Sequence, residues 1–233
     1  MCRKLESFGL DPARIHQFRN WADLDRVQPL DQPSSYRTEW DIQAPHVALY
    51  SGNIANKQGI EIVVEAARRL KHRKDLSFVV CGNGPNRAAL EREAADLGNI
   101  IFRDLQPQER LGELMGLATV HLLPQKAGAA DLVLPSKLTN MLASGRAVVA
   151  TAAGGTGLAR EVEGCGIVTQ PGDAAAFASA IERLLDDEKL RRQCGGAARR
   201  MAEKVWGQTA ILEGLEDKLG ARSRVSSPPA SKR

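Results

Sequence analysis

The chain has 233 residues, of which 43% are hydrophobic and 4% aromatic, and 32 basic against 28 acidic side chains give a net charge of +4. This is the composition of a globular protein with one large domain. A membrane-spanning protein is excluded by the lack of a long apolar run, and a nucleic-acid-binding protein by the lack of a basic body with stacking aromatic residues.

The first 45 residues show no alternation of strands and helices. They begin M-C-R-K-L-E-S-F-G-L, which lacks the apolar core of a signal peptide, so we expect a cytoplasmic protein. R-I-H-Q-F-R-N-W-A-D follows at 14–23, and a stretch rich in proline, glutamine and aspartate continues through Pro45. We interpret residues 1–45 as a connector and the remnant of a preceding domain, with Trp21 fixing the connector in place.

From His46 onward, short apolar runs alternate with amphipathic segments. Strands are predicted at 46–50, 77–81, 99–103, 119–123, 147–150 and 166–168. Helices are predicted at 57–71, 86–97, 107–117, 173–185, 188–205 and about 208–219, with a further short helix that opens at Pro135 and Ser136. Near-continuous apolar strands that are each followed by a helix indicate a parallel sheet covered on both faces, which is a doubly wound, Rossmann-like α/β domain over 46–205.

Ligands of such domains bind outside the carboxyl ends of the strands. The segments predicted there are 51–53, 82–85, 104–106, 124–136 and 151–157. They are rich in glycine and small polar residues, which let backbone N–H groups approach a phosphate-bearing ligand.

Lys137 is predicted in the first turn of a helix at this edge, where the helix dipole disfavours a cation. The Ser136 hydroxyl is placed to cap the same helix. An exposed lysine there loses only about 0.3–1 kcal/mol, so a solvated side chain is one interpretation. The other is an anion site, because an ammonium group and free N–H groups together suit a phosphate.

The cysteines and histidines are scattered, without C-x-x-C or H-E-x-x-H spacing, so we expect neither a protein-bound metal nor a disulfide framework. Cys81 and Cys165 are expected to be small buried hydrophobes, and His121 a satisfied core histidine. Trp40 and Trp206 are expected to be structural residues with packing or docking roles.

The tail at 221–233 is rich in serine and proline and holds four basic residues without an acid, so it accounts for the whole net charge. We expect it to be disordered. A solvated chain end is the commoner role of such a tail, and peripheral contact with anionic lipid at the inner face of the membrane is the alternative.

Four motifs, in this order, carry a resemblance to a known family: Y-S-G-N-I-A-N-K-Q-G-I-E, C-G-N-G-P, L-P-S-K-L-T-N-M-L-A-S-G-R-A-V-V-A and G-C-G-I-V-T-Q-P-G-D. Together they resemble the C-terminal half of a GT-B glycosyltransferase of the family-4-like group, in particular the colanic acid type that builds exopolysaccharides. The resemblance covers roughly 14–219.

The resemblance implies a retaining transfer of a sugar from a nucleoside diphosphate to a glycan or lipid-linked acceptor, without a metal ion or a resident cofactor. Enzymes of the family have two Rossmann-like domains, and the second binds the nucleotide-sugar donor. We therefore expect that the N-terminal, acceptor-binding domain is missing from this chain and that residues 206–220 form a helix returning toward it. We expect the chain alone to bind the donor with little or no transfer of sugar. We also expect it to self-associate through the face that would meet the missing domain.

The resemblance also assigns the site. Lys57 and Lys137 match the two basic residues that face the donor diphosphate, and these are the catalytic candidates. The donor-binding candidates are Gly52, Asn53, Gly82, Gly84, Leu105, Gln106, Asp131, Ser136 and Asn140. Of these, Leu105 and Gln106 lie near the base in the family.

The chain departs from the family's pattern at three places. Asn53 stands where many members have arginine, and Asn140 and Leu132 stand where the family has two glutamates. Asp131, adjacent to Leu132, is the candidate for the lost contact to sugar hydroxyls, against the alternative of an ordinary loop aspartate. These departures affect the ribose and sugar contacts more than the phosphate contacts.

Three other functions stay open. A sugar-nucleotide epimerase shares the fold but would need acid–base groups in the cleft, of which few are visible. A degenerate, non-catalytic donor domain fits the lost glutamates but not the two lysines. In a dinucleotide-dependent oxidoreductase, G-N-G would be part of the dinucleotide-binding motif and Asp104 would be its ribose-binding acid. The third glycine of that motif is absent.

Overall fold

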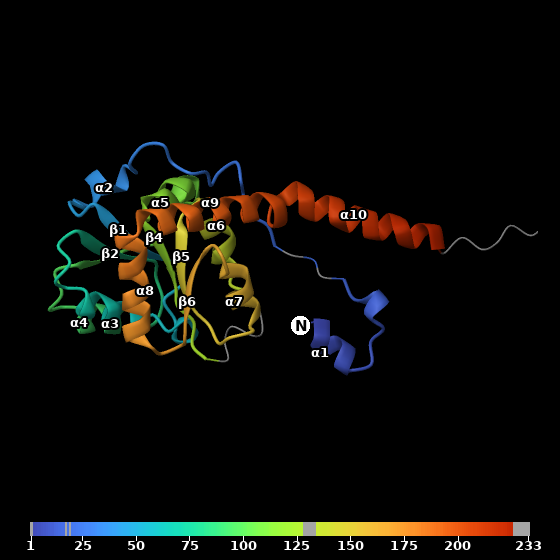
Figure 1. Ribbon diagram of the computed structural model, residues 1–233, viewed down its shortest axis with the longest axis horizontal. Coiled ribbons are helices and arrows are strands. Elements are labelled where there is room, and N and C mark those ends of the chain that lie inside the picture. Colours follow the sequence, from blue (N-terminus) through green and yellow to red (C-terminus); the bar gives the residue numbers. More distant parts are fainter. Residues whose placement is uncertain (1, 17, 19, 128–133, 226–233) are drawn as a thin grey trace, which may run out of the picture.

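The computed structural model describes residues 2–16, 18, 20–127 and 134–225. Its centre is a parallel sheet of six strands in the order β3-β2-β1-β4-β5-β6, with helices on both faces (Figure 1). The strands are β1 (His46–Ser51), β2 (Leu76–Cys81), β3 (Ile100–Arg103), β4 (Val120–Leu123), β5 (Ala147–Thr151) and β6 (Gly166–Thr169). The predicted doubly wound α/β fold is confirmed, and every predicted strand is present.

The helices of the body are α3 (Glu61–Arg69), α4 (Arg87–Glu93), α5 (Leu111–Leu117), α6 (Lys137–Ala143), α7 (Gly157–Val162), α8 (Ala174–Asp186) and α9 (Glu188–Val205). Before the sheet lie α1 (Cys2–Ser7) and α2 (Tyr36–Glu39), and after it lies α10 (Gln208–Val225). Short 3-10 turns occupy η1 (Pro12–Arg14), η2 (Asn56–Gln58) and η3 (Gln108–Arg110).

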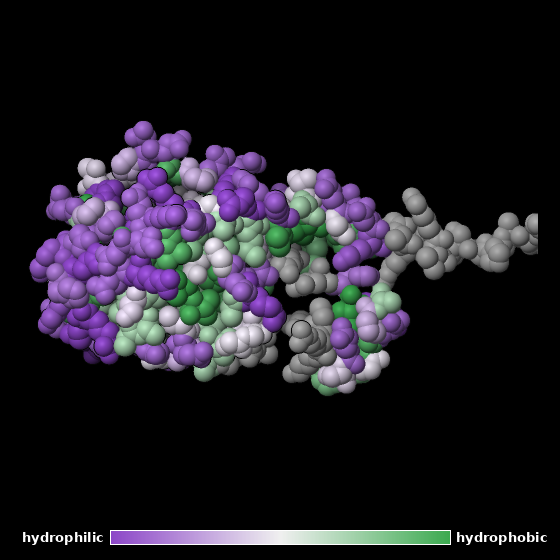
Figure 2. All heavy atoms as spheres, in the orientation of Figure 1, coloured by the Kyte–Doolittle hydropathy of each residue, from purple (hydrophilic) through white to green (hydrophobic). Residues whose placement is uncertain are grey.

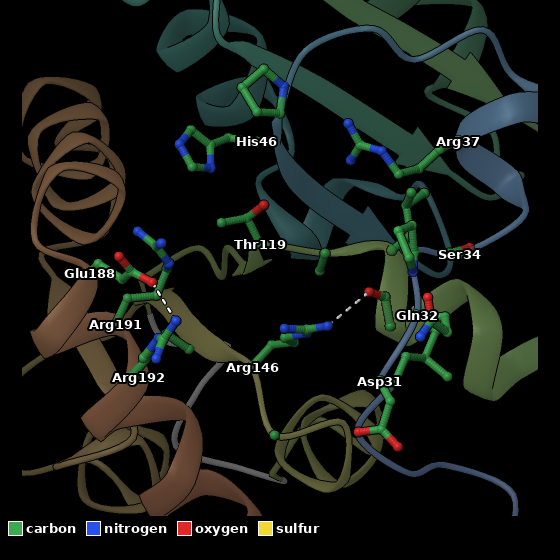
Figure 3. Close-up of a pocket in the computed structure, with 18 residues that line it drawn as sticks. Asp31, Gln32, Ser34, Arg37, His46, Thr119, Arg146, Glu188, Arg191 and Arg192 are labelled. Carbon is green, nitrogen blue, oxygen red and sulfur yellow. Dashed lines mark hydrogen bonds and ion pairs between the residues drawn. The ribbon is translucent and has the colours of Figure 1, made fainter.

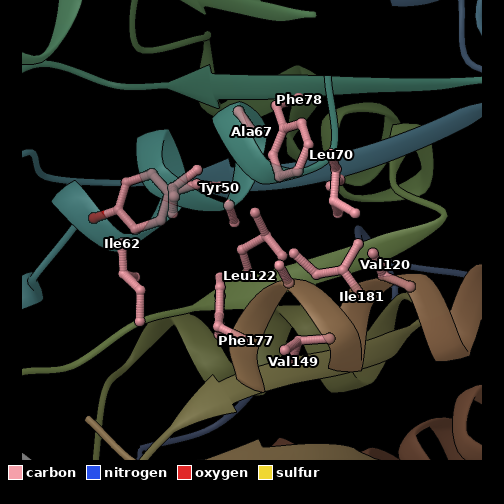
Figure 4. Packing of buried hydrophobic residues seen from close by; sticks show 14 of the residues in the cluster. Tyr50, Ile62, Ala67, Leu70, Phe78, Val120, Leu122, Val149, Phe177 and Ile181 are labelled. Atoms are coloured by element: carbon pink, nitrogen blue, oxygen red, sulfur yellow. The ribbon is translucent and has the colours of Figure 1, made fainter. Parts of the chain in front are cut away.

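Side chains alternate between the two faces of each strand and so divide the core into two layers. On β1, Ala48 and Tyr50 face the layer under α3, α4 and α8, whereas Val47 and Leu49 face the layer under α5, α6, α7 and α9. Figure 4 shows the first layer, where the ring of Tyr50 lies beside Ile62 and its hydroxyl points away from the apolar side chains. This hydroxyl lies at the carboxyl edge of the sheet.

The segment predicted as a connector contributes to the body. Ala22, Val27, Tyr36 and Ile42 are all buried in the layer under α5 and α6. Ala22 also forms a parallel bridge with Gly207, and its N–H donates to the carbonyl of Trp206 at 2.8 Å. The entering chain and the leaving chain therefore meet at one point of the body.

Several predicted helix boundaries are wrong, and α7 was not predicted. The helix α4 ends at Glu93 rather than at 97, and α5 begins at Leu111 rather than at 107, after the turn η3. The helix predicted from 57 begins only at Glu61, because Gly59 adopts a left-handed φ of +63° and separates it from the turn η2. The tail predicted as disordered from 221 is helical through Val225, since alanine and arginine extend α10 at little cost; residues 226–233 lie outside the described residues.

Hydrophilic side chains dominate one end and the upper rim of the visible face of the body, whereas apolar ones show in its centre, at the base of α10 and on the N-terminal segment (Figure 2). The large exposed apolar residues follow this distribution: Phe8, Leu10 and Phe18 precede the body, and Val205, Leu212 and Leu219 end it. Leu105 is the exception discussed below. None of the described helices combines the length and the apolar character needed to cross a membrane.

Candidate functional site

The loops that follow β1 and β2 are in direct backbone contact at the carboxyl edge of the sheet. Gly52 has φ +134° and Gly82 has φ +152°. A Cβ atom on Gly82 would lie 1.9 Å from the carbonyl oxygen of Gly52, so no larger residue fits. The N–H of Gly52 donates to Cys81 O and the N–H of Ile54 donates to Asn83 O, both at 2.9 Å.

Lys137 reaches this pair of loops from the first turn of α6. Its Nζ donates to the hydroxyl of Tyr50 at 2.9 Å and lies 4.2 Å from the centre of the Tyr50 ring. The Tyr50 hydroxyl in turn donates to the carbonyl of Asn53 at 2.5 Å. A Cβ atom on Gly52 would lie only 2.8 Å from Nζ, so a side chain there would require the lysine tip to shift.

The ammonium group of Lys137 is buried beside neutral partners. Burial lowers its pKa from 10.5 to about 8, and burial also raises the pKa of Tyr50. No carboxylate among the described residues pairs with Lys137. A half-buried cation whose ammonium group has only a phenol as partner among the described residues is suited to receive an anion.

The start of α6 differs from the prediction. Ser136 has helical backbone angles and its side chain accepts no capping hydrogen bond, because the N–H of Leu138 donates to the carbonyl of Pro135 at 3.0 Å. With seven residues, α6 also brings only a short dipole. The charge at this edge therefore comes from the lysine itself rather than from a capped helix end.

The structure brings several predicted residues to this cluster. Asn53 and Gly84 touch, since a Cβ atom on Gly84 would lie 2.8 Å from Asn53 Oδ1. Asn140 lies one helical turn after Lys137 on α6 and is half-buried. Leu105 follows β3 and is 63% exposed, beside Gln106, whose Nε2 donates to Asp104 O at 2.8 Å.

Two predicted residues are not joined to the cluster. Lys57 is exposed on η2, and its carbonyl accepts from the N–H of Lys126 at 3.3 Å. Asp131 lies outside the described residues, as does Leu132.

Two residues that the sequence did not single out as site residues border the cluster, and a third, Lys126, lies beside the turn η2. Tyr50 holds Lys137, as described above. Arg87 of α4 donates to Gly82 O at 3.1 Å and to Asn83 Oδ1 at 2.6 Å and pairs with Asp104. Lys126 pairs with Glu61 at 3.2 Å. An aromatic residue at the end of a buried strand was the available signal for Tyr50; the other two resemble ordinary surface cations in sequence.

A groove of about 590 Å³ adjoins η2 and Lys126. It is lined by residues of three segments, 59–65, 125–127 and 171–174, together with Thr151. Thr151 holds the loop after β4, because its Oγ1 exchanges hydrogen bonds of 2.7 Å with the backbone of Gln125. The groove lies at the same edge as Lys137, at the ends of β4, β5 and β6.

The residues expected to be structural are so. Cys81 and Cys165 are buried, and burial raises the pKa of each thiol to about 11. His121 is fully buried, with Nε2 3.0 Å from Ser144 Oγ, and burial lowers its pKa to about 3. It is a core histidine but only half satisfied, because its buried Nδ1 has no hydrogen-bond partner among the described residues. Trp206 is buried, and Trp40 stacks on Tyr36 with ring centres 4.3 Å apart. Within the part of the chain that the structure describes, no group of three metal-binding side chains gathers.

Residues 35–201 match the family described as glycosyl transferases group 1. The chain is 35% identical over 220 residues to the putative colanic acid biosynthesis glycosyl transferase WcaI of Escherichia coli, covering 91% of this chain and 53% of that protein. It is 28% identical over 191 residues to the alpha-D-kanosaminyltransferase of Streptomyces kanamyceticus, covering 79% of this chain and 48% of that protein. The chain thus spans about half the length of these relatives.

Solved structures share the fold. HepE of Anabaena in complex with UDP superposes with a TM-score of 0.82 at 16% identity, over 94% of this chain and 61% of that one. The C-terminal domain of a group 1 glycosyl transferase, LpcC of Francisella tularensis, superposes with a TM-score of 0.67 at 18% identity. It is matched over 80% of this chain and 99% of its own length, so a unit of this size has been solved separately.

Proposed function

The chain belongs to the group 1 glycosyl transferase family, and we propose that it is the donor-binding half of a retaining glycosyltransferase that transfers a sugar from a nucleoside diphosphate to a glycan or lipid-linked acceptor. The observation that carries the proposal is the buried ammonium group of Lys137 beside Gly52, with a phenol as its partner. This arrangement supplies a fixed positive charge where the ligands of doubly wound sheets bind.

The reaction explains why such a charge is needed. When the bond between the sugar and the diphosphate breaks, negative charge grows on the departing phosphate oxygen. A fixed cation and N–H groups aimed at that oxygen stabilise the transition state more than the ground state. In the proposed complex, Lys137 contacts the diphosphate and the glycine loops at Gly52 and Gly82 let the ligand approach the backbone.

The nucleoside is proposed to lie toward the end of β3. Leu105 is a large apolar side chain that is 63% exposed at this edge, and a base covering it would remove apolar surface from water. Gln106 is half-buried beside it. The complexes of HepE with UDP and with UDP-glucose support a nucleotide donor, since that protein shares this fold.

The diphosphate carries more charge than one lysine neutralises. We propose that Lys57 is a second contact, reached by movement of the exposed turn η2, and that protein cations take the place of a metal ion and of any resident cofactor. The acceptor site is proposed to lie in a further domain, and the chain covers 53% of the length of its colanic acid relative. The chain alone would then bind donor nucleotide without transferring sugar.

Calorimetric titration of the chain with UDP, GDP, ADP and NAD tests the proposal. We expect one nucleoside diphosphate to bind, and we expect Lys137→Met to weaken that binding at least 30-fold, since a charge-assisted contact is worth about 2–3 kcal/mol. Methionine keeps the apolar stem and removes only the charge.

The matched control is Lys204→Met, which removes an exposed charge from α9. It should leave the affinity unchanged, and Lys57→Met should give a smaller loss than Lys137→Met. Preferential binding of NAD, or equal affinities of the Lys137→Met and Lys204→Met variants for the nucleoside diphosphate, would contradict the proposal.

A further inference from the structure

The opposite edge of the sheet carries a second cavity, which the proposed donor site does not use. It has a volume of about 700 Å³ and lies at the amino ends of β1, β4 and β5 (Figure 3). Residues 30–34 and Arg37 form one wall, His46, Thr119 and Arg146 lie at the strand starts, and Glu188, Arg191 and Arg192 of α9 close the other side.

Positive charge is in excess in this cavity. Four arginines line it, namely Arg37, Arg146, Arg191 and Arg192, against two carboxylates, Asp31 and Glu188. Glu188 is already engaged, because it pairs with Arg192 at 2.6 Å. Arg37, Arg146 and Arg191 form no ion pair with any residue that the structure describes.

Arg191 has a structural role that explains its charge. Its Nη1 donates to the carbonyls of Leu184 and Leu185, both at 2.8 Å, at the C-terminal end of α8. A cation at this end of a helix is favourable by about 0.3–1 kcal/mol. The guanidinium group of Arg191 therefore needs no further partner.

Arg146 has no comparable set of partners. Its Nη2 makes one long contact of 3.4 Å to the carbonyl of Gly116, and its buried Nε donates to nothing. Guanidinium stays charged at any physiological pH, so its own deprotonation cannot relieve the cost of burial. Arg146 is half-buried with its Nε cut off from water, and charged groups removed from water are normally paired. The missing partner is therefore expected to be an anion from solution.

The titration of neighbouring groups is consistent with this positive potential. Burial and then the charge of Arg191 lower the pKa of Arg146. Burial is also the main cause that lowers the pKa of His46; the charged groups facing it are Arg191, Asp75, Arg73 and Arg37, of which only Asp75 acts in the opposite direction.

We propose that this cavity binds a phosphomonoester, with the phosphate between the guanidinium groups of Arg146 and Arg37 and the organic part against Leu30, Pro33 and Leu117. Arginine forks match the oxygens of a phosphate in pairs, and a dianion neutralises two of them. The volume exceeds that of inorganic phosphate, and the wall at 30–34 supplies apolar contacts.

This site is separate from the proposed donor site. The two edges are a strand length apart, and β1 has six residues, which span about 20 Å at the usual rise per residue. Binding at one edge should therefore occur with the other edge filled. The two proposals can fail independently. When UDP fills the donor site, any further binding of a phosphomonoester reports on the cavity at the amino edge.

His46 provides a local probe, since the chain has four histidines and His46 lines the cavity. In NMR titrations of the full chain at constant ionic strength with UDP present, glycerol 3-phosphate should raise the pKa of His46 by about one unit, as a nearby anion does. His46→Gln assigns the resonance. Glycerol, which lacks the phosphate, should have no effect.

Arg146→Gln and Arg37→Gln should each weaken the binding of glycerol 3-phosphate at least tenfold in calorimetry, and the second variant serves if the first does not fold. The control, Arg200→Gln, removes an equal charge from an exposed position of α9 outside the cavity and should bind normally. An unchanged pKa of His46, or equal weakening by all three substitutions, would overturn the proposal.

The phosphomonoester can be free or the headgroup of a lipid. Flotation with vesicles of phosphatidylcholine containing phosphatidic acid separates the two sources. Arg146-dependent flotation identifies a lipid headgroup, and glycerol 3-phosphate binding without flotation identifies a free metabolite. Failure of both probes overturns the proposal.

Discussion

At the carboxyl edge of the sheet the positive charge is one lysine enclosed by backbone, whereas at the amino edge it is four arginines spread around an open cavity. Lys137 is held by a single phenol and lies against Gly52, where a Cβ atom would be 2.8 Å from its Nζ. The arginines instead come from the connector, from the start of β5 and from α9. Arg192 pairs with a carboxylate, whereas Arg37, Arg146 and Arg191 donate to backbone carbonyls, Arg37 to that of Ala44.

Each edge acquires its positive charge in a different way. A buried lysine beside glycine depends on backbone conformation, so the carboxyl edge is sensitive to the smallest change of a main-chain position. An arginine cluster depends on long side chains from separate elements, so the amino edge tolerates backbone change and responds to charge. Three substitutions, ordered by the expected size of their effect, test this contrast.

Gly82→Ala should have the largest effect. Its Cβ would lie 1.9 Å from the carbonyl oxygen of Gly52 at a φ of +152°, so the loops after β1 and β2 must separate. We expect a loss of about 3 kcal/mol in the free energy of unfolding, measured by urea denaturation. Gly98→Ala is the control, because its Cβ would contact nothing within 4 Å; a similar loss there would show that the close contact is not the cause.

Lys137→Met should stabilise the protein while it weakens nucleotide binding. The folded-state pKa of Lys137 is about 8 and the ordinary value is 10.5, so the charged form is disfavoured by folding. This cost is present below pH 8 and disappears as the pH rises toward 10.5. The variant should therefore be more stable than the wild type by about 1–3 kcal/mol at pH 7, with a smaller difference at pH 10.

The stability of the two proteins, measured by urea denaturation at both pH values, checks this prediction. Arginine does not titrate in this range, so Arg146→Met should show no such pH dependence relative to the wild type. A Lys137→Met protein that is less stable than the wild type at pH 7 would mean that the phenol contact outweighs the cost of burial.

Tyr50→Phe should have the smallest effect of the three. It keeps the ring over Lys137 but removes the hydroxyl that accepts from Nζ and donates to Asn53 O. We expect a loss of about 1–2 kcal/mol in stability, and a decline of nucleotide affinity that sets in at lower pH than in the wild type. Tyr36→Phe is the control, because the buried Tyr36 hydroxyl has no hydrogen-bond partner; it should change stability by less than about 0.5 kcal/mol.

The strands were predictable from the sequence because each is a short apolar run, and all six begin within one residue of the predicted position. Helix starts were less predictable. The apolar spacing continues from 57 into α3, and only the backbone angle of Gly59 shows that the turn η2 is separate. Likewise, composition favoured a disordered end from 221, whereas α10 continues to Val225.

The site at the carboxyl edge was predictable in part because, like the strands, some of its residues lie in local sequence patterns. Lys137 and the glycines lie in local motifs that can be read along the chain. Tyr50 was not predicted as a site residue, because its role depends on a contact with a residue 87 positions away. The amino-edge cavity was not visible at all: Arg37, Arg146 and Arg191 are far apart in sequence, and each looks like an ordinary surface cation until the fold assembles them.

The bridge between Ala22 and Gly207 has a mechanical consequence. Force applied to the two ends of the chain enters the body at neighbouring points, where the Ala22 N–H donates to Trp206 O. Tension is carried across this contact and bypasses the six strands. In a single-molecule pulling experiment the bridge should therefore open first, at low force, and release the N-terminal segment and α10 while the sheet stays closed.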